Sequence, residues 1–165
     1  RIMASKLRVN QIEPVNGIPT GGGGGIIQVK MTQTINSGSQ FSTGSGTYVD
    51  VTGYNCTISP TSTSSKILVT INPIFLLNNG SGTSQRVALK LLRDSTSLLD
   101  QNDFCSHQVG NAEADYLGVA GYFQYLDSPS STSALTYKVQ VRQHAGGGTT
   151  YVQETSSIML QEISG

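Results

Sequence analysis

The chain has 165 residues and a mass of 17.4 kDa, and its ten Lys and Arg balance ten Asp and Glu, which gives a formal net charge of zero. Only 12% of the residues are charged, against roughly 25% in a typical soluble domain, and Gly, Ser, Thr, Asn and Gln replace them. This composition excludes the clustered basic surface that binds nucleic acid or an anionic membrane. No apolar run reaches the roughly 18 residues of a membrane-spanning helix. We therefore predict no nucleic-acid partner and no membrane insertion.

The first twenty residues are polar, with isolated apolar side chains between them. Pro14 and Pro19 prevent a continuous helix and favour extended backbone at the residue before each of them. We predict an extended attachment segment over residues 1–20 that becomes ordered against a partner, the alternative being a disordered tail. The apolar side chains assigned to this attachment are Leu7, Val9, Ile12, Val15 and Ile18.

Five consecutive glycines separate this segment from the rest of the chain. Residues without a Cβ have no side chain to pack and no preferred backbone conformation. The run also lacks the Gly-Lys-Ser/Thr ending of a phosphate-binding loop. We predict a hinge over residues 21–25 between the attachment segment and a head domain over residues 26–165. The hinge residues are Gly21, Gly22, Gly23, Gly24 and Gly25.

The head shows the two-residue alternation of β-strands from its first residues to its last. Ile27, Val29 and Met31 share one side of the first strand, and Pro73 interrupts a long apolar segment, which indicates a sheet edge or a bulge there. The residues from Asp100 to Glu113 are expected to be irregular. The predicted strands are Ile26–Thr34, Thr47–Val51, Tyr54–Ser59, Lys66–Leu77, Arg86–Arg93, Thr96–Leu99, Tyr116–Leu126, Ala134–Gln143 and Ser157–Ile163.

Eight or nine strands at spacings near ten residues, with no amphipathic helix, predict an all-β fold. We expect the head to be an antiparallel β-sandwich or jelly roll that follows the extended N-terminal segment. A close hairpin is expected at Thr52-Gly53, between two short strands.

Residues that bind metals or form disulfides are few. Cys56 and Cys105 are predicted to be free thiols, because a head of this size is stable without a disulfide. Asp103, His107 and Glu113 lie near Cys105, and a metal site there is the alternative to a solvated polar loop. We favour the polar loop and predict no metal and no cofactor.

The sequence shows no catalytic signature. It lacks a G-x-S-x-G motif, and its scattered acids offer no defined pair for glycoside hydrolysis, so we predict that the protein is not an enzyme. Tyr48, Tyr54 and Tyr151 lie near predicted strand ends or turns, where an aromatic ring can pack against a sugar. They are our candidate glycan contacts, and the alternative is that they are core or interface residues with bonded hydroxyl groups.

Three parts of the chain together resemble small structural proteins of tailed phages, particularly the tail-fibre and head-fibre proteins of marine and cyanobacterial phages. The first is SKLRVNQI (residues 5–12), which continues through Asn16-Gly17 and the glycine run to IIQVK (residues 26–30). The second is YVDVTG (residues 48–53) followed by TISPTSTSSKILV (residues 57–69), and the third is SIMLQEI (residues 157–163).

The resemblance implies a non-enzymatic virion component, assembled in the host cytoplasm. Its N-terminal segment would attach to other virion proteins, and its β-sandwich head would be a homotrimer that projects as a fibre or spike. A host-surface glycan is a further candidate partner. The chain is shorter than a typical receptor-binding fibre and has no repetitive shaft, so a capsid decoration (cement) protein and a carbohydrate-binding module remain alternatives. Closed symmetry fits this interpretation, because it lets one apolar patch be buried repeatedly.

Overall fold

The computed structural model describes residues 25–33, 40–80, 84–108 and 116–165, and within these ranges it contains twelve β-strands and no helix. All strand pairs are antiparallel. The strands are β1 (Ile26–Gln33), β2 (Phe41–Thr43), β3 (Val49–Ile58), β4 (Lys66–Asn72), β5 (Ile74–Asn78), β6 (Ser84–Arg93), β7 (Thr96–Gln108), β8 (Tyr116–Ala120), β9 (Phe123–Asp127), β10 (Leu135–Gly146), β11 (Thr149–Val152) and β12 (Ser157–Ile163).

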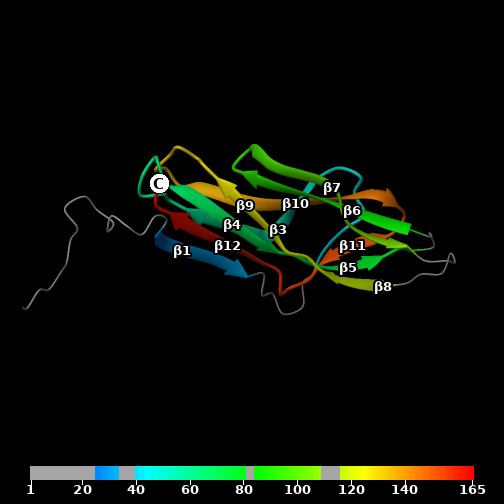
Figure 1. Ribbon diagram of the computed structural model, residues 1–165. Helices are drawn as coiled ribbons and strands as arrows, with labels where there is room; N and C mark the ends of the chain where they lie inside the picture. The colour runs from blue at the N-terminus through cyan, green and yellow to red at the C-terminus, as the bar shows by residue number, and fades with distance from the viewer. Residues whose placement is uncertain (1–24, 34–39, 81–83, 109–115) are drawn as a thin grey trace, which may run out of the picture.

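Two layers make up the head (Figure 1). The strands β1-β12-β4-β9 and β2-β11-β5-β8 form two four-stranded sheets in the same relative order, and each strand of one continues along the chain into a strand of the other. We call this pair of sheets the bent layer. The opposing layer is the sheet β3-β10-β6-β7. With each bent strand counted once, the fold has two sheets of four strands, the arrangement of a jelly roll. The predicted all-β antiparallel sandwich is confirmed.

The core lies between the two layers. The bent layer contributes Ile67, Val69 and Ile71 of β4 with Ile158 and Leu160 of β12, and each has an exposed fraction of 1% or less. The opposing layer contributes the buried side of β6 and β10, which is Val87, Leu89, Leu91, Tyr137, Val139 and Val141. The clean alternation that predicted strands over residues 86–93 and 134–143 therefore marks the side that faces the core.

The bends occur at residues that interrupt the sheet hydrogen bonds. Pro73 has no N–H to donate, and it separates β4 from β5 where the sequence predicted an interruption. Its carbonyl oxygen accepts a bond of 2.7 Å from the N–H of Gly121. Gly121 separates β8 from β9, and a Cβ at this position would lie 2.7 Å from the Phe104 ring. The single strand predicted over Tyr116–Leu126 is therefore wrong, because close packing at Gly121 divides it.

Two further predictions about the strands are wrong. Residues 49–58 form one strand rather than two strands around a hairpin, because Gly53 adopts a φ of 77° and produces an irregularity within β3 opposite a register shift in β10. The described part of the segment expected to be irregular, residues 100–108, is the second half of β7 and pairs with β6 up to Gln108, whereas residues 109–113 lie outside the described residues. β7 is an edge strand with mostly exposed side chains, so it lacks the apolar alternation that identifies a strand.

The predicted attachment residues and the first four hinge glycines lie outside the described residues, as does Glu113. Gly25 is described, and its carbonyl oxygen accepts a 3.1 Å bond from the N–H of Ser164. The start and the end of the head therefore meet at one edge of the bent layer. In the part of the chain that the structure describes, no helix has the length and apolar character needed to cross a membrane.

Candidate interaction surfaces

The outward side of the bent layer carries apolar side chains in cross-strand rows. Residues directly opposite each other on paired strands share a side of the sheet. The strand register aligns two such outward rows, Met31–Met159–Thr70–Gln124 and Val29–Gln161–Leu68–Leu126. Met31, Val29 and Leu126 have exposed fractions of 57%, 49% and 50%. Large apolar groups thus lie open to solvent across this sheet.

The polarity of β1 is the reverse of what a solvent-exposed sheet surface needs. Val29 and Met31 point outward, whereas Gln28 and Thr32 take the half-buried inward positions. The predicted division of this strand into an apolar and a polar side is correct, but the apolar side faces away from the core. Gln28 is held there because its amide nitrogen donates to Glu162 Oε2 at 2.6 Å and to the carbonyl oxygen of Ser59 at 2.7 Å.

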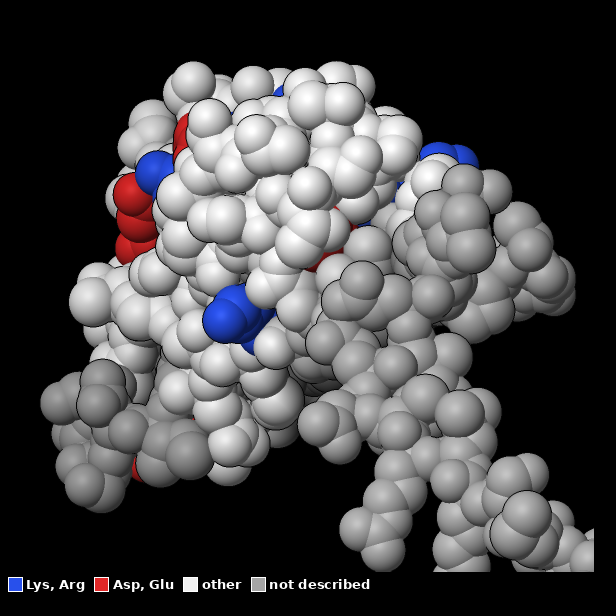
Figure 2. Space-filling model, turned by 90° about the vertical axis from the view of Figure 1, so that its left-hand side faces the viewer, with Lys and Arg blue, Asp and Glu red and all other residues white. Residues whose placement is uncertain are grey.

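The outward side also carries large apolar side chains beyond the bend, together with the polar residues Ser42, Asn78 and Thr149. Tyr151 of β11 lies opposite Leu76 of β5, and Ile74 and Tyr116 also occupy outward positions. Among the described strand residues, Lys66 at the end of β4 is the one charged side chain on this side of the layer. We define the apolar face as Val29, Met31, Leu68, Ile74, Leu76, Tyr116, Leu126, Tyr151 and Met159. The end of the molecule near the C-terminus is also mostly uncharged (Figure 2).

The opposing layer carries charges on its outward side. Lys138 Nζ lies 2.9 Å from Asp50 Oδ2, and Lys90 Nζ lies 2.9 Å from Asp100 Oδ2. We define the charged face as Asp50, Arg86, Lys90, Asp100, Asp103, Lys138 and Arg142. Each of its three acids lies beside one base, and the fourth base, Arg142, donates to Asn102 Oδ1 at 2.7 Å, so the charges of this face are largely paired within it.

Tyr48 belongs to the charged face rather than to an open aromatic surface. Lys90 Nζ lies 4.1 Å and Arg142 Cζ lies 5.1 Å from the centre of its ring, both within the range of cation–π contacts. Its hydroxyl donates to Asp100 Oδ1. Partial burial and this bond raise the pKa of Tyr48. The ring already contacts cations of the protein itself, and its contact with a glycan stays a prediction.

The other two candidate tyrosines occupy different environments. Tyr54 has no exposed surface, and its hydroxyl donates to the carbonyl oxygen of Ser157 at 3.1 Å across the core. Burial raises the pKa of this phenol well above its ordinary value. The predicted glycan contact is wrong for Tyr54, because a sugar cannot reach a buried ring. Tyr151 is half-buried on the apolar face. The three rings therefore lie in three different places: Tyr48 on the charged face, Tyr54 in the core and Tyr151 on the apolar face.

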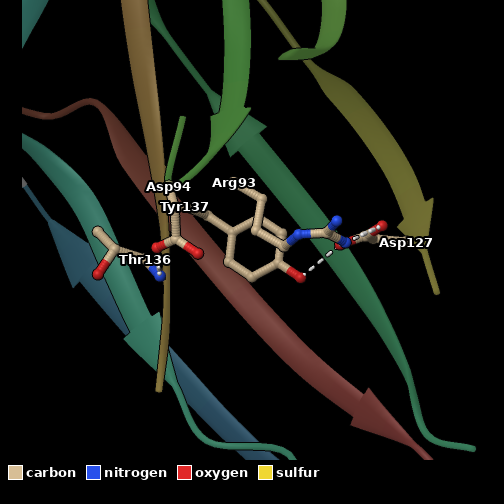
Figure 3. Close-up of polar contacts among 5 residues, drawn as sticks. All are labelled: Arg93, Asp94, Asp127, Thr136 and Tyr137. Atoms are coloured by element: carbon tan, nitrogen blue, oxygen red, sulfur yellow. Dashed lines mark hydrogen bonds and ion pairs between the residues drawn. The ribbon is translucent and has the colours of Figure 1, made fainter. Parts of the chain in front are cut away.

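An ionic cluster that the sequence analysis missed joins the two layers inside the sandwich (Figure 3). Arg93 Nη1 of β6 donates to both carboxylate oxygens of Asp127 at 2.8 Å and 2.6 Å, and the Tyr137 hydroxyl donates to Asp127 Oδ2 at 2.7 Å. Burial, and then the bond to Asp127, raise the pKa of Tyr137. The signal was present in the sequence, since Asp127 continues the inward alternation of Phe123 and Tyr125.

A second inward carboxylate lies in the same cross-strand row. Glu162 is fully buried and accepts bonds of 2.7 Å from both the N–H and the hydroxyl of Thr61, in addition to the bond from Gln28. Burial opposes ionisation, but the hydrogen bonds from Gln28 and Thr61 and the nearby Ser65 hydroxyl outweigh it and lower the pKa of Glu162 to about 2. The ionised carboxylate thus fastens β1 and the turn before β4 to β12.

Two of the residues considered for a metal site, Asp103 and Cys105, have surroundings that do not suit a metal ligand. Asp103 Oδ1 lies 3.8 Å from Arg86 Nη1 and 3.1 Å from His144 Nδ1, and burial raises the pKa of Cys105 to about 12, which keeps its thiol protonated. Among the described residues, no three His, Cys, Asp or Glu side chains come together as metal ligands.

Both cysteines are free thiols, as predicted. Cys56 lies on β3 and Cys105 on β7, which are the two edges of the opposing layer. Three strand spacings of about 4.8 Å separate these edges, whereas a disulfide requires Cα atoms within about 7 Å.

Comparison with protein families and with curated proteins gives no match. Among solved structures, the chain is similar to a chain of the T13 particle of infectious bursal disease virus, with 12% identity over 97% of this chain and 35% of that chain and a TM-score of 0.48. It is also similar to a chain of the VP2 subviral particle of the same virus, with 11% identity over 81% of this chain and 32% of that chain and a TM-score of 0.46. A third similar structure is Eiger TNF from S. frugiperda, with 14% identity over 81% of this chain and 90% of that chain and a TM-score of 0.44. The chain spans about a third of the two viral chains, and these similarities do not assign it to a family.

Proposed function

We propose that this protein is a non-enzymatic structural subunit of a phage particle. Residues 1–20 attach it to other virion proteins, the glycines form a hinge, and the head projects outward as part of a homotrimeric short fibre or spike. A capsid decoration protein is the alternative placement of the same subunit. The observation that carries the proposal is how the head holds β1, the strand that directly follows the hinge.

β1 is an edge strand that is nevertheless fixed firmly to the head. It pairs with β12 from Ile26 to Gln33, and the bonds of Gln28 to Glu162 and Ser59 hold its inward side. The bond between Gly25 and Ser164 closes its beginning onto the C-terminal end of the head. A force on residues 1–20 would therefore pass through the glycines to a strand that the core retains, as a tethered head requires.

The sequence supports the same role. Residues 5–30, residues 48–69 and residues 157–163 carry the resemblance to phage structural proteins, and the low charge favours a subunit that associates. Three weak N-terminal attachments would act together with a high effective concentration, and a flexible glycine linker allows them to engage at once.

Attachment is tested by deleting Arg1–Thr20 and measuring incorporation of the chain into phage particles during infection, by immunodetection on purified virions. We expect the deletion to abolish incorporation while circular dichroism still shows the folded head. The control changes Asn10 and Gln11 to Ser, and the matched variant changes Val9 and Ile12 to Ser. Normal incorporation of the deleted chain would contradict the attachment role.

Contact with a host-surface glycan is a second proposal, favoured by the surroundings of Tyr48. Its half-exposed ring lies beside Asp100, Lys90 and Arg142, and polar groups next to an aromatic ring suit a sugar. Binding on a glycan array that is lost in Tyr48→Ala would support it, and Tyr151→Ala, in the other layer, tests the second candidate ring separately. The absence of binding at millimolar sugar would count against it.

A further inference from the structure

We propose that the apolar face of the bent layer is the contact surface between copies of this chain. The inference rests on the proposed homotrimer and specifies which surface forms it. The chemistry, the size and the strand polarity of the face each bear on the identity of the partner.

The apolar face is continuous rather than a scatter of single exposed residues. Leu68 and Leu126 are adjacent in one cross-strand row, with Gln161 between Leu68 and Val29, and Met31 and Met159 are adjacent in the next row, which ends in Thr70 and Gln124. Beyond the bend, Tyr151 and Leu76 are direct neighbours. Large contiguous apolar patches on soluble proteins mark sites of association, because their contact with water is unfavourable.

The size of the face fits a stable interface. Four strands spaced about 4.8 Å apart give a width of roughly 19 Å, and thirteen residues from β4 to the end of β5 give a length of roughly 43 Å at about 3.3 Å each. The outward side of the bent layer as a whole therefore covers on the order of 800 Å², close to what each partner contributes in an interface of standard size, and the apolar face makes up part of it. A trimer divides this face and the adjoining edges between two neighbours.

The charge distribution favours a second copy over a charged partner. The apolar face presents no acid or base in its interior, so copies related by symmetry bring no like charges together. The charged face behaves differently, because its acids and bases would have to lose water on association, and this penalty offsets much of their attraction. The layer that associates is therefore the uncharged one.

The reversed polarity of β1 requires a partner. If the outward side of the bent layer met only water, the inward positions of β1 would be the place for its apolar residues. Instead Gln28, Lys30 and Thr32 occupy the inward side, where Lys30 remains exposed, and Val29 and Met31 point outward at 49% and 57% exposure. This strand lies at the edge of the layer, where a neighbouring copy can cover it.

The test places one charge on each side of the sandwich in the full-length chain. Val29→Lys and Leu126→Lys put an ammonium group on the apolar face, and Thr57→Lys puts the same group at an exposed outward position of β3 in the opposing layer. Light scattering over a range of concentrations gives the mass, and urea unfolding of the dilute protein checks the fold. We expect both apolar-face variants to raise the concentration of half-association at least tenfold, with Thr57→Lys close to wild type.

Two results would overturn the inference. Trimers of unchanged concentration dependence in both apolar-face variants would place the interface elsewhere. The second result is a wild-type chain that stays monomeric and whose β1 and β12 amides are protected from hydrogen exchange until Arg1–Thr20 is removed. This result would assign the apolar face to the N-terminal segment of the same chain.

Failure of the inference is distinguishable from failure of the proposed function. Unchanged association in the variants, together with normal incorporation of the wild type into particles, would reject the surface and keep the role. Association that depends on the apolar face, together with no incorporation of the wild type, would keep the surface and reject the role.

Discussion

Two inward carboxylates, Glu162 and Asp127, lie in one cross-strand row at the end of the sandwich near the C-terminus. Ile67 separates them, and Gln28 completes the row on β1. Each acid faces a different partner, since Glu162 binds the turn before β4 and Asp127 binds Arg93 and Tyr137 of the opposing layer. At this end of the sandwich, the hydrogen bonds and the ion pair of these two carboxylates thus hold the strands together.

Glu162 makes stability depend on pH below about 4.5. Its pKa is about 2 in the folded protein against 4.5 ordinarily, so its contribution is complete above pH 4.5 and disappears as the pH falls toward 2. The contribution is on the order of 3 kcal/mol. We expect the difference in unfolding free energy between wild type and Glu162→Gln to shrink between pH 6 and pH 2.5, measured by urea unfolding. A difference that does not change with pH would contradict this role.

We expect substitutions in the buried Asp127 cluster to lower the free energy of unfolding more than a substitution in an exposed ion pair. Tyr137→Phe removes a bond to a buried carboxylate and should lower the unfolding free energy by about 2 kcal/mol, and Asp127→Ala should cost about 3 kcal/mol because Arg93 loses its partner. Asp50→Ala breaks an exposed pair and should cost no more than about 1 kcal/mol. Urea unfolding at neutral pH measures all three, and equal costs for Asp127 and Asp50 would refute the interpretation.

The turn from β10 to β11 contains glycines at positions with little space for a side chain. Gly146 and Gly148 flank the turn from β10 to β11 at φ values of 89° and 135°, and a Cβ at these positions would lie 1.9 Å from the carbonyl oxygen of Ser84 and 2.0 Å from that of Asn78. Gly147, between them, has no atom within 4 Å of such a Cβ. One turn therefore contains two demanding positions and one permissive one.

This contrast gives a prediction with an internal control. Gly146→Ala and Gly148→Ala should each lower the unfolding free energy by more than about 2 kcal/mol, since both backbone strain and a close contact oppose the methyl group. Gly147→Ala should change it by less than about 0.5 kcal/mol. Thermal unfolding of the three variants measures this, and similar losses at all three positions would contradict the geometry.

The sequence predicted strands where alternation met the core and failed where other forces decided. Leu135, Tyr137 and Val139 alternate into the core, so β10 was found, and Ser157–Ile163 was predicted with its observed bounds. β7 was missed because the exposed polar side chains of an edge strand show no period, and its pairing comes from β6. The division at Gly121 depends on contact with Phe104, which is remote in sequence.

The surfaces were less predictable than the strands. Alternation showed that β1 has an apolar side, but the side that faces the core is decided by the bonds of Gln28 to Glu162 and Ser59, which join distant parts of the chain. The burial of Tyr54 and the cations around Tyr48 likewise follow from packing between strands, which no local pattern contains.

At the scale of the whole molecule, the two outward sides differ in chemistry. The charged face pairs each of its acids with a base, and the apolar face leaves Val29, Met31, Tyr116 and Leu126 exposed to water. An isolated head of this kind would leave a large apolar surface exposed to water. Association through that area connects the fold, the low charge and the proposed role on a particle.

The mass of the full-length chain in solution tests this account most directly. Light scattering across a hundredfold range of concentration should give about three times 17.4 kDa at the upper end, with the apolar face buried between copies. A mass of 17.4 kDa at every concentration would contradict the account, because the apolar face would then remain open in the isolated protein.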